Sequence, residues 1–291
     1  MILPALLKIL LLGLTMMASS AFAEDALLFD DNGRLPIGFK GDDAEKIYDT
    51  LANLPKMKKG QLETAAEYEV RLNKLDKKAV TFDNGKNLGS RLVMILMATH
   101  DLHDRYASEA HTMTVKDGGL FECNVFSYEN TRIMLDGFLT SMQVQDLGDY
   151  TAKNAYSKQV TITQRKIVEV MVGESRPLGW NAGRVANIFD DAVALKPEPT
   201  QAQEAKGYTR MLVIGVLKSP FFYRGWKHHA PTVDEPWKTY TEVKALMVSI
   251  EEIWLYNEQS GEIYKKVKLS PRRLYFGARD FGGKQGAGRC Q

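Results

Sequence analysis

The sequence predicts an α+β fold, with N-terminal helices packed on a largely antiparallel β-sheet. Apolar residues recur at helical spacing through the first third of the chain, and after Gly118 and Gly119 they alternate with a period of two. The pattern lacks strict strand–helix–strand alternation, which disfavours a parallel sheet. The chain has 291 residues, and its 44% hydrophobic and 25% charged content is ordinary for a globular protein.

The first 23 residues are typical of a secretory signal peptide. Lys8 precedes an apolar run, and Ala21 and Ala23 supply the small residues that a signal peptidase requires. The run is shorter than the roughly 20 apolar residues of a membrane anchor. We therefore expect residues 1–23 to be removed, leaving a soluble periplasmic protein with no transmembrane segment after cleavage.

Capping signals place the first helices of the mature chain. Asp42 begins a capping pair for a helix that ends before Pro55. Thr64 and Glu67 form a capping box for a second helix, which carries one apolar stripe. A third helix is predicted over residues 88–106, where the apolar residues fall within one arc. We expect it to be the most buried helix.

Strands follow the helices. They are predicted at residues 120–128, 131–139, 157–163, 166–172, 211–217, 244–256 and 262–269, with a short polar helix at 200–206. The segment MLVIGVL, residues 211–217, is apolar on both faces, as expected for a covered central strand. We expect one α+β domain over residues 24–270, followed by a basic, Gly-rich tail at 271–291.

One segment is similar to a known group of proteins. Residues 59–72, KGQLETAAEYEVRL, resemble the KGEFETTAEYEARL-like segment of exported bacterial proteins of uncharacterised function. Residues 148–156 and 253–262 resemble further pieces of that family in the same order. The resemblance implies an exported domain in which this segment is a structural element, with no known catalytic residue to carry over. The helix predicted at 88–106 is a departure, because the family is expected to enter its strands sooner.

Histidines provide the best candidates for a metal site. His100 and His103 have the i, i+3 spacing that lets two ligands face one ion on a helix. Zinc needs three or four ligands and the spacing is not H-E-x-x-H, so a packed His103 and a surface pair of His100 with Asp104 is the favoured interpretation. His228 and His229 form a weaker candidate in a predicted loop, because adjacent histidines usually point in different directions.

Motifs for covalent or nucleotide chemistry are absent from the sequence. It contains no G-x-S-x-G elbow, no S-x-x-K and no P-loop. We therefore predict a non-enzymatic binding or envelope-associated module without a cofactor. The alternative is a metal-dependent envelope hydrolase that uses His100 and His103.

The two cysteines allow a disulfide in an oxidising compartment. Cys123 lies in a predicted strand and Cys290 is the penultimate residue. One hypothesis is that they pair and hold the tail. The other is a buried Cys123 and a free Cys290.

Charge is concentrated at the two ends of the mature chain. Residues 24–51 carry eight acidic and three basic residues, whereas residues 265–291 carry eight basic residues and one acidic residue. The basic end is either solvated or binds an anionic partner, which we expect to be an unknown protein or an anionic envelope component. Export makes nucleic acid a poor partner. The candidate contacts in the tail are Arg272, Arg273, Arg279 and Lys284.

Overall fold

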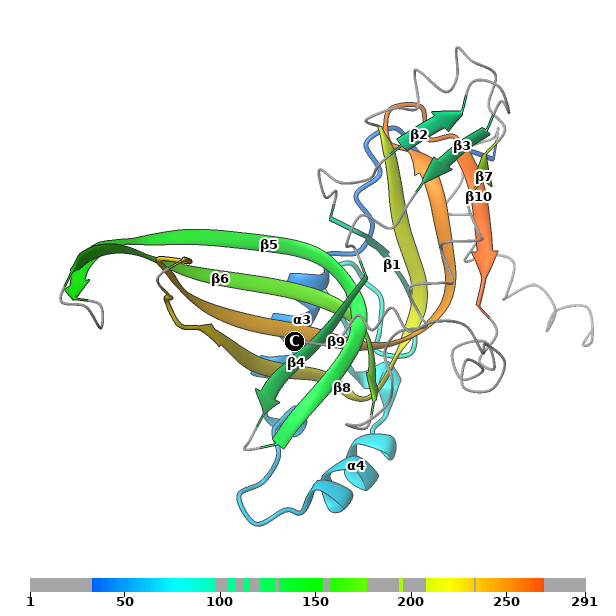
Figure 1. Ribbon diagram of the computed structural model, residues 1–291. Coiled ribbons are helices and arrows are strands. Elements are labelled where there is room, and N and C mark those ends of the chain that lie inside the picture. Colours follow the sequence, from blue (N-terminus) through cyan, green and yellow to red (C-terminus); the bar gives the residue numbers. More distant parts are fainter. Residues whose placement is uncertain are drawn as a thin grey trace, which may run out of the picture.

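Long β-strands dominate the part of the chain that the computed structural model describes (Figure 1). The described residues are 33–97, 104–107, 112–115, 121–128, 131–153, 158–176, 194–195, 208–232 and 234–269. The helical elements are α3 (Ala44–Asn53), η1 (Pro55–Met57), α4 (Ala65–Asn73) and η2 (Lys77–Ala79). The strands are β1 (Arg91–Ile95), β2 (Asp104–Ala107), β3 (Thr112–Val115), β4 (Phe121–Tyr128), β5 (Thr131–Lys153), β6 (Gln159–Arg176), β7 (Ala194–Leu195), β8 (Thr209–His229), β9 (Trp237–Asn257) and β10 (Ile263–Lys268).

The predicted α+β class is wrong, because the described part of the protein is mainly β. The α-helices α3 and α4 have only ten and nine residues, whereas β5, β8 and β9 have 23, 21 and 21. The sequence pattern showed only the most apolar part of each long strand. Polar residues and glycines in the remaining parts interrupt the alternation on which strand prediction depends.

The helix predicted at residues 88–106 is also wrong, since β1 and β2 occupy part of that range. Leu92, Val93 and Met94 are all buried in β1, so this strand has no exposed face. A short apolar run of this kind fits a buried strand as well as a buried helix. The predicted helix at 200–206 lies outside the described residues.

The main sheet has seven strands in the order β1-β8-β4-β5-β6-β9-β10, with a further pairing between β8 and β9. All pairs are antiparallel except β6 with β9. Because β8 contacts both β9 and β4, strands β4, β5, β6, β9 and β8 form a closed ring. Ser127 lies opposite Trp226 where β4 meets β8. A separate antiparallel sheet contains β2, β3 and β7.

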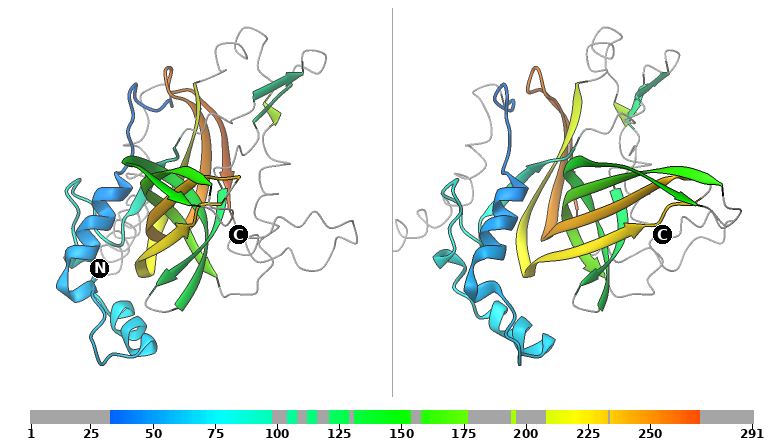
Figure 2. Two further views of the ribbon diagram at one scale, coloured as in Figure 1. Left: turned by 60° about the vertical axis from the view of Figure 1, so that its left-hand side comes forward. Right: turned by 90° about the vertical axis from the view of Figure 1, so that its left-hand side faces the viewer.

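Strands β8 and β9 form one long hairpin that is shared between two regions (Figure 2). In the first region, residues 211–217 pair with residues 248–255, next to β1 and β10; we call this the buried half. In the second, residues 224–229 pair with residues 239–244, next to β6; we call this the projecting half. Register shifts after Ile214 and after Leu217 separate the halves and bend the ladder.

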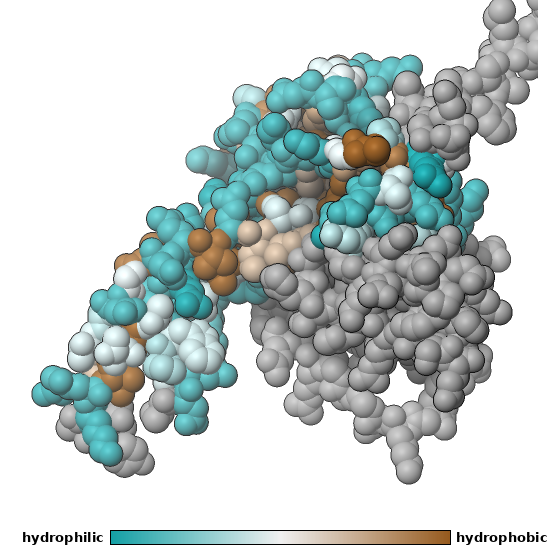
Figure 3. Space-filling view, turned by 90° about the horizontal axis from the view of Figure 1, so that it is seen from above, coloured by the Kyte–Doolittle hydropathy of each residue, from teal (hydrophilic) through white to brown (hydrophobic). Residues whose placement is uncertain are grey.

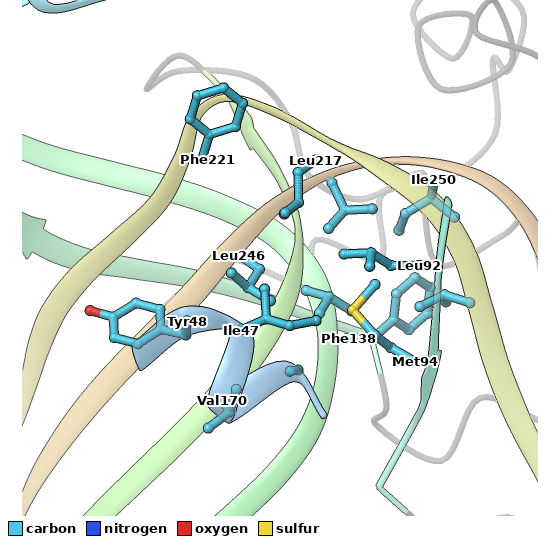
Figure 4. Close-up of a cluster of buried hydrophobic side chains, with 14 of the residues drawn as sticks. Ile47, Tyr48, Leu92, Met94, Phe138, Val170, Leu217, Phe221, Leu246 and Ile250 are labelled. Carbon is cyan, nitrogen blue, oxygen red and sulfur yellow. The ribbon is translucent and has the colours of Figure 1, made fainter. Parts of the chain in front are cut away.

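The largest core cluster lies between the helices and the sheet. Ile47 and Tyr48 of α3 belong to the same buried cluster as Phe138, Val170 and Leu246 of the strands (Figure 4). Each fully buried side chain of this size contributes about 1.5–3 kcal/mol through its removal from water. The core therefore fixes α3 against one face of the sheet.

The start of α3 differs by one residue from its prediction. Asp43 is the cap, because its side chain accepts a hydrogen bond from the Lys46 amide at 3.0 Å. Asp42 instead accepts from the Val93 amide at 2.6 Å and from Lys86 Nζ at 2.8 Å. Its carboxylate thus ties the segment before α3 to β1. Neither helix in the described part of the chain has the length and apolar character needed to cross a membrane.

Candidate functional site

Most residues that the sequence singled out lie outside the described residues. They are the signal segment 1–23, His100 and His103, Cys290, and Arg272, Arg273, Arg279 and Lys284. Cys123 belongs to β4, but its proposed partner is not described. Within the described ranges, no group of three His, Cys, Asp or Glu residues could hold a metal ion. The metal, disulfide and tail hypotheses therefore stay predictions.

The segment at residues 59–72 is closed on itself by hydrogen bonds. The Glu63 carboxylate accepts from the Gly60 amide at 2.9 Å and from Arg71 Nε and Nη2 at 2.7 and 2.9 Å. Arg71 also donates to the carbonyls of Lys56 and Lys58, at 2.5 and 2.9 Å. The charged pair therefore organises the loop before α4, and its bonding capacity is used within the segment.

The N-terminus of α4 is built in the same way. Thr64 accepts from the Glu67 amide at 3.2 Å and donates its own amide to Glu67 at 2.9 Å, which confirms the predicted capping box. Hydrogen bonds from Arg71 and the Gly60 amide lower the pKa of Glu63 to about 2. Hydrogen bonds from Thr64 lower the pKa of Glu67. These contacts explain the segment as a structural element.

Exposed aromatic and aliphatic side chains gather instead at the projecting end of the sheet, where β5, β6, β9 and β8 lie side by side (Figure 1). The exposed large hydrophobic residues of these strands are Met142, Val144, Leu147, Tyr150, Trp226, Trp237 and Tyr240. Figure 3 shows hydrophobic side chains among hydrophilic ones on this projecting part. Opposite residues in a ladder share a face, so the register assigns side chains to the face that α3 covers or to the opposite face. We call these the outer and inner faces.

The outer face carries alternating aromatic and basic side chains beyond the end of α3. Trp226 lies opposite Glu242, and Tyr240 lies opposite His228 on one side and Lys166 on the other. We define the aromatic–basic face by six residues from three strands: Lys166, Arg224, Trp226, His228, Lys238 and Tyr240.

Cations and rings on this face contact one another. The Arg224 guanidinium lies 5.3 Å from the centre of the Trp226 ring. Lys238 Nζ and the His228 ring each lie 4.9 Å from the centre of the Tyr240 ring. Cation–π contacts of this kind hold the side chains in place and contribute about 0.5–1 kcal/mol each at exposed sites. The face is therefore ordered by contacts between its own side chains.

The face also retains positive charge. Glu242 is buried and forms an ion pair with Arg224 at 2.7 Å. Among the described residues, no carboxylate forms an ion pair with Lys166 or Lys238. A hydrogen bond to the Tyr240 hydroxyl raises the pKa of Lys238 above its ordinary value and so further favours the charged form of this lysine. Because Glu242 is neutralised by Arg224, the described part of this face attracts anions.

The boundary of the aromatic–basic face is set by α3. Lys244 Nζ contacts Glu45 at 2.9 Å and Asp49 at 3.0 Å. Burial favours the neutral form of Lys244, but hydrogen bonds to these two carboxylates outweigh it and raise the lysine pKa. The positive charge of the strands is thus neutralised beneath α3 and becomes accessible beyond it.

Two of the basic side chains on the inner face contact carboxylates. Lys227 Nζ lies 2.7 Å from Glu169 Oε2. The His229 ring stacks on Trp237 with a centroid separation of 6.0 Å, and its Nε2 lies 3.2 Å from Glu235 Oε2. His228 and His229 therefore lie on opposite faces, as expected for adjacent residues, although they belong to β8 rather than to the predicted loop. They do not form a joint metal site.

Sequence reasoning found part of this arrangement. His228 and His229 stand out in the sequence, whereas Lys166, Lys238 and Tyr240 do not. The alternation of side chains from Trp237 to Glu242 is the sequence pattern that indicates a strand with two different faces. Only the strand register shows which of these side chains lie beside those of β8.

Comparisons with known proteins identify no relative of this chain. No family model matches this chain, and no curated protein or solved structure does. The function must therefore be argued from the site itself.

Proposed function

We propose that this protein is an exported, periplasmic binding module that holds an anionic envelope component on its aromatic–basic face. The proposal rests on an exposed tryptophan that lies on the same face as two lysines. Trp226 is 49% exposed, and it shares a face with Lys166 and Lys238, which no described carboxylate neutralises. Export itself is predicted from the signal segment at residues 1–23.

The aromatic side chains supply contact area at little entropic cost. Trp226 and Tyr240 each have two side-chain torsions, and neighbouring strands fix their backbones. Rigid rings of this kind are favoured at binding surfaces because they present a large amphipathic area without losing much freedom on binding. This supports a ligand with flat or apolar parts in addition to its charge.

The cations select the sign of the ligand. Lys166, Lys238 and Arg224 lie on one surface, and among the described residues the buried Glu242 is the carboxylate that pairs with this group, through Arg224. Attraction between exposed charges acts over roughly 8 Å at physiological salt. Binding should therefore be short-ranged and should weaken as salt is added. The predicted basic tail would add to the same attraction.

The test is retention of the purified protein on a washed cell-envelope fraction, at about 20 mM and about 150 mM salt. Two variants remove the two kinds of contact: Trp226→Ala, and the double variant Lys166→Gln/Lys238→Gln. We expect each to lower the retained fraction at least about fivefold at low salt, the loss that about 1 kcal/mol per contact gives.

Matched controls separate the site from general effects. Trp237→Ala removes a similarly exposed tryptophan from the inner face, and Lys74→Gln/Lys78→Gln removes two exposed lysines far from the projecting end. Both controls should be retained like the unaltered protein. Equal loss in the controls, or unchanged retention of the test variants, would refute the assignment of this face.

A further inference from the structure

One edge of β5, the edge opposite β6, lacks a neighbouring strand along much of its length in the described part of the chain. Strand β4 pairs with β5 only over residues 131–138, whereas β6 pairs with the other edge over residues 134–153. The Leu139 carbonyl accepts from the Met97 amide at 2.9 Å. Beyond this point no described strand pairs with the edge, which leaves backbone donors and acceptors available to another chain.

A regular six-residue stretch of this edge lies between two bulges. The register of β5 with β6 shifts between Leu139 and Ser141 and again between Asp146 and Gly148. The stretch between them reads Ser-Met-Gln-Val-Gln-Asp and contains no Lys or Pro, which commonly block sheet edges. Its only charge, Asp146, is held by Arg165 Nε at 3.1 Å. Between the two bulges, the residues that normally prevent pairing are therefore missing.

Two exposed apolar side chains on this stretch share the inner face. Met142 lies opposite Glu169 and Val144 lies opposite Ile167, and these two β5 side chains are 40% and 52% exposed. On the outer face, Gln143 donates to Glu45 at 3.1 Å. A strand added to this edge would cover the apolar pair and find polar side chains on the other face.

We propose that residues 141–146 pair antiparallel with the same stretch of a second copy of this chain, about a two-fold axis at Gln143 and perpendicular to the sheet. Such an axis keeps each face of one copy continuous with the same face of the other, so opposite residues must share a face. In this register Met142 lies opposite Val144 of the second copy, twice by symmetry. The two Gln143 amides meet at the axis.

The charge pattern selects this register among its neighbours. It places Asp146 opposite Thr140 of the second copy, so no like charges face each other. Moving the axis to Val144 would place Met142 opposite Asp146, which is unfavourable for both side chains. Because cross-strand apolar pairs are the unit of sheet stabilisation, the Gln143 register is the one that a second copy fits.

The pairing has a consequence for the binding surface. A perpendicular axis places the outer faces of both copies on the same side of one continuous sheet, so two aromatic–basic faces are presented together. A polymeric ligand that spans both would gain avidity without any new contact. The self-association can be tested without the proposed ligand, since it uses the edge of β5 and not the aromatic–basic face.

The first test measures oligomeric state by sedimentation velocity over about 1–200 µM protein, because a short strand pairing buries less area than a standard interface and is weak. Val144→Lys places a charge opposite Met142 of the second copy twice. Val70→Lys, on α4, is the matched control because both valines are 52% exposed. We expect a reversible dimer in the unaltered protein and in Val70→Lys, and at least a tenfold weaker dimer in Val144→Lys.

The second test uses cross-linking and does not depend on Val144→Lys folding. Gln143→Cys places two thiols opposite each other at the axis, whereas Gln145→Cys lies on the same face but opposite Ser141 of the second copy. Mild oxidation should link the first variant and not the second, relative to the unaltered protein with its own cysteines. A monomer at every concentration, a dimer equally stable in Val144→Lys, or equal cross-linking of both cysteine variants would overturn the proposal.

Discussion

In the buried half of the β8–β9 hairpin, Leu212 and Ile214 pack into one core cluster and Val213 packs into another on the opposite face. In the projecting half, Arg224, Trp226 and His228 alternate with Lys227 and His229, and most of these side chains reach solvent. Both halves belong to the same antiparallel ladder of the same two strands. Their backbone hydrogen bonding is alike, so the difference lies in the side chains.

The contrast separates the residues that specify the fold from those available for binding. The buried half is covered by helices on one face and by the N-terminal segment around Leu35 on the other. The projecting half has α3 over its beginning only, where Lys244 meets Glu45. In the projecting half the strands extend beyond the layers that cover them but remain paired with neighbouring strands. Exposed rings and cations are therefore held on a rigid backbone, as a binding surface requires.

The strongest test of this contrast makes the same substitution in both halves. Trp254 is 3% exposed, and its Nε1 donates to Glu252 at 2.7 Å. Trp254→Ala should lower the free energy of unfolding by about 3–5 kcal/mol, because it leaves a cavity in the buried half. Trp226→Ala should lower it by less than about 1 kcal/mol, since that ring already meets water. Urea unfolding of the two variants provides the measurement.

The two tryptophan variants should also differ in binding, and here Trp226→Ala should have the larger effect. Trp226→Ala should lose envelope retention while staying folded, whereas Trp254→Ala should keep retention at temperatures where it remains folded. If Trp226→Ala proved as destabilising as Trp254→Ala, the projecting half would be part of the core and the comparison would fail.

A smaller effect is expected from the ion pair on the inner face. Glu169 and Lys227 are only partly exposed, so Glu169→Gln removes a carboxylate that compensates a shielded lysine. We expect a loss of about 1–2 kcal/mol in the free energy of unfolding. Asp146→Asn is the matched control, because its partner Arg165 is half exposed and such surface pairs contribute less than about 1 kcal/mol. Equal losses would show that the lower exposure of the Glu169–Lys227 pair does not strengthen it.

The sequence predicted those parts of the fold that depend on local contacts. The capping box of Thr64 and Glu67 is present because both partners lie within one helical turn. The strands predicted at 244–256 and 262–269 correspond to part of β9 and to β10, and Gly261, with a φ of 70°, suits the turn between them. The N-cap was misplaced because Asp42 is bound by Lys86, which only the fold brings near.

Non-local pairing explains what the sequence could not show. The run around Leu92 was assigned to a helix because nothing in it reveals that β8 pairs with it. The aromatic–basic face was found only in part, because Trp226 and Tyr240 belong to strands whose register is set elsewhere in the sheet. A sequence pattern reports on contacts within one segment. The proposed binding surface is made by contacts between segments, so the sequence alone does not show it.

The smallest expected effect on stability concerns the loop before α4. This loop is stabilised by hydrogen bonds to a charged side chain, the Glu63 carboxylate. The pKa of Glu63 is lowered to about 2 by its hydrogen bonds from Arg71 and the Gly60 amide. A carboxylate whose pKa is lowered on folding contributes stability above its unfolded pKa of about 4.5 and loses it as the pH falls toward 2. Its contribution should therefore be complete at neutral pH.

Glu63→Gln should accordingly lower the melting temperature at pH 7 by a few degrees at most, since solvent screens the pair. The difference from the unaltered protein should stay constant down to about pH 5 and shrink steadily from there toward pH 2, where the native carboxylate also becomes protonated. Glu69→Gln on the exposed side of α4 is the matched control and should show no such pH dependence. Thermal melts followed by circular dichroism across this range decide the matter. A difference that persists unchanged at pH 2 would mean that Glu63 acts through the shape of the loop rather than through its charge.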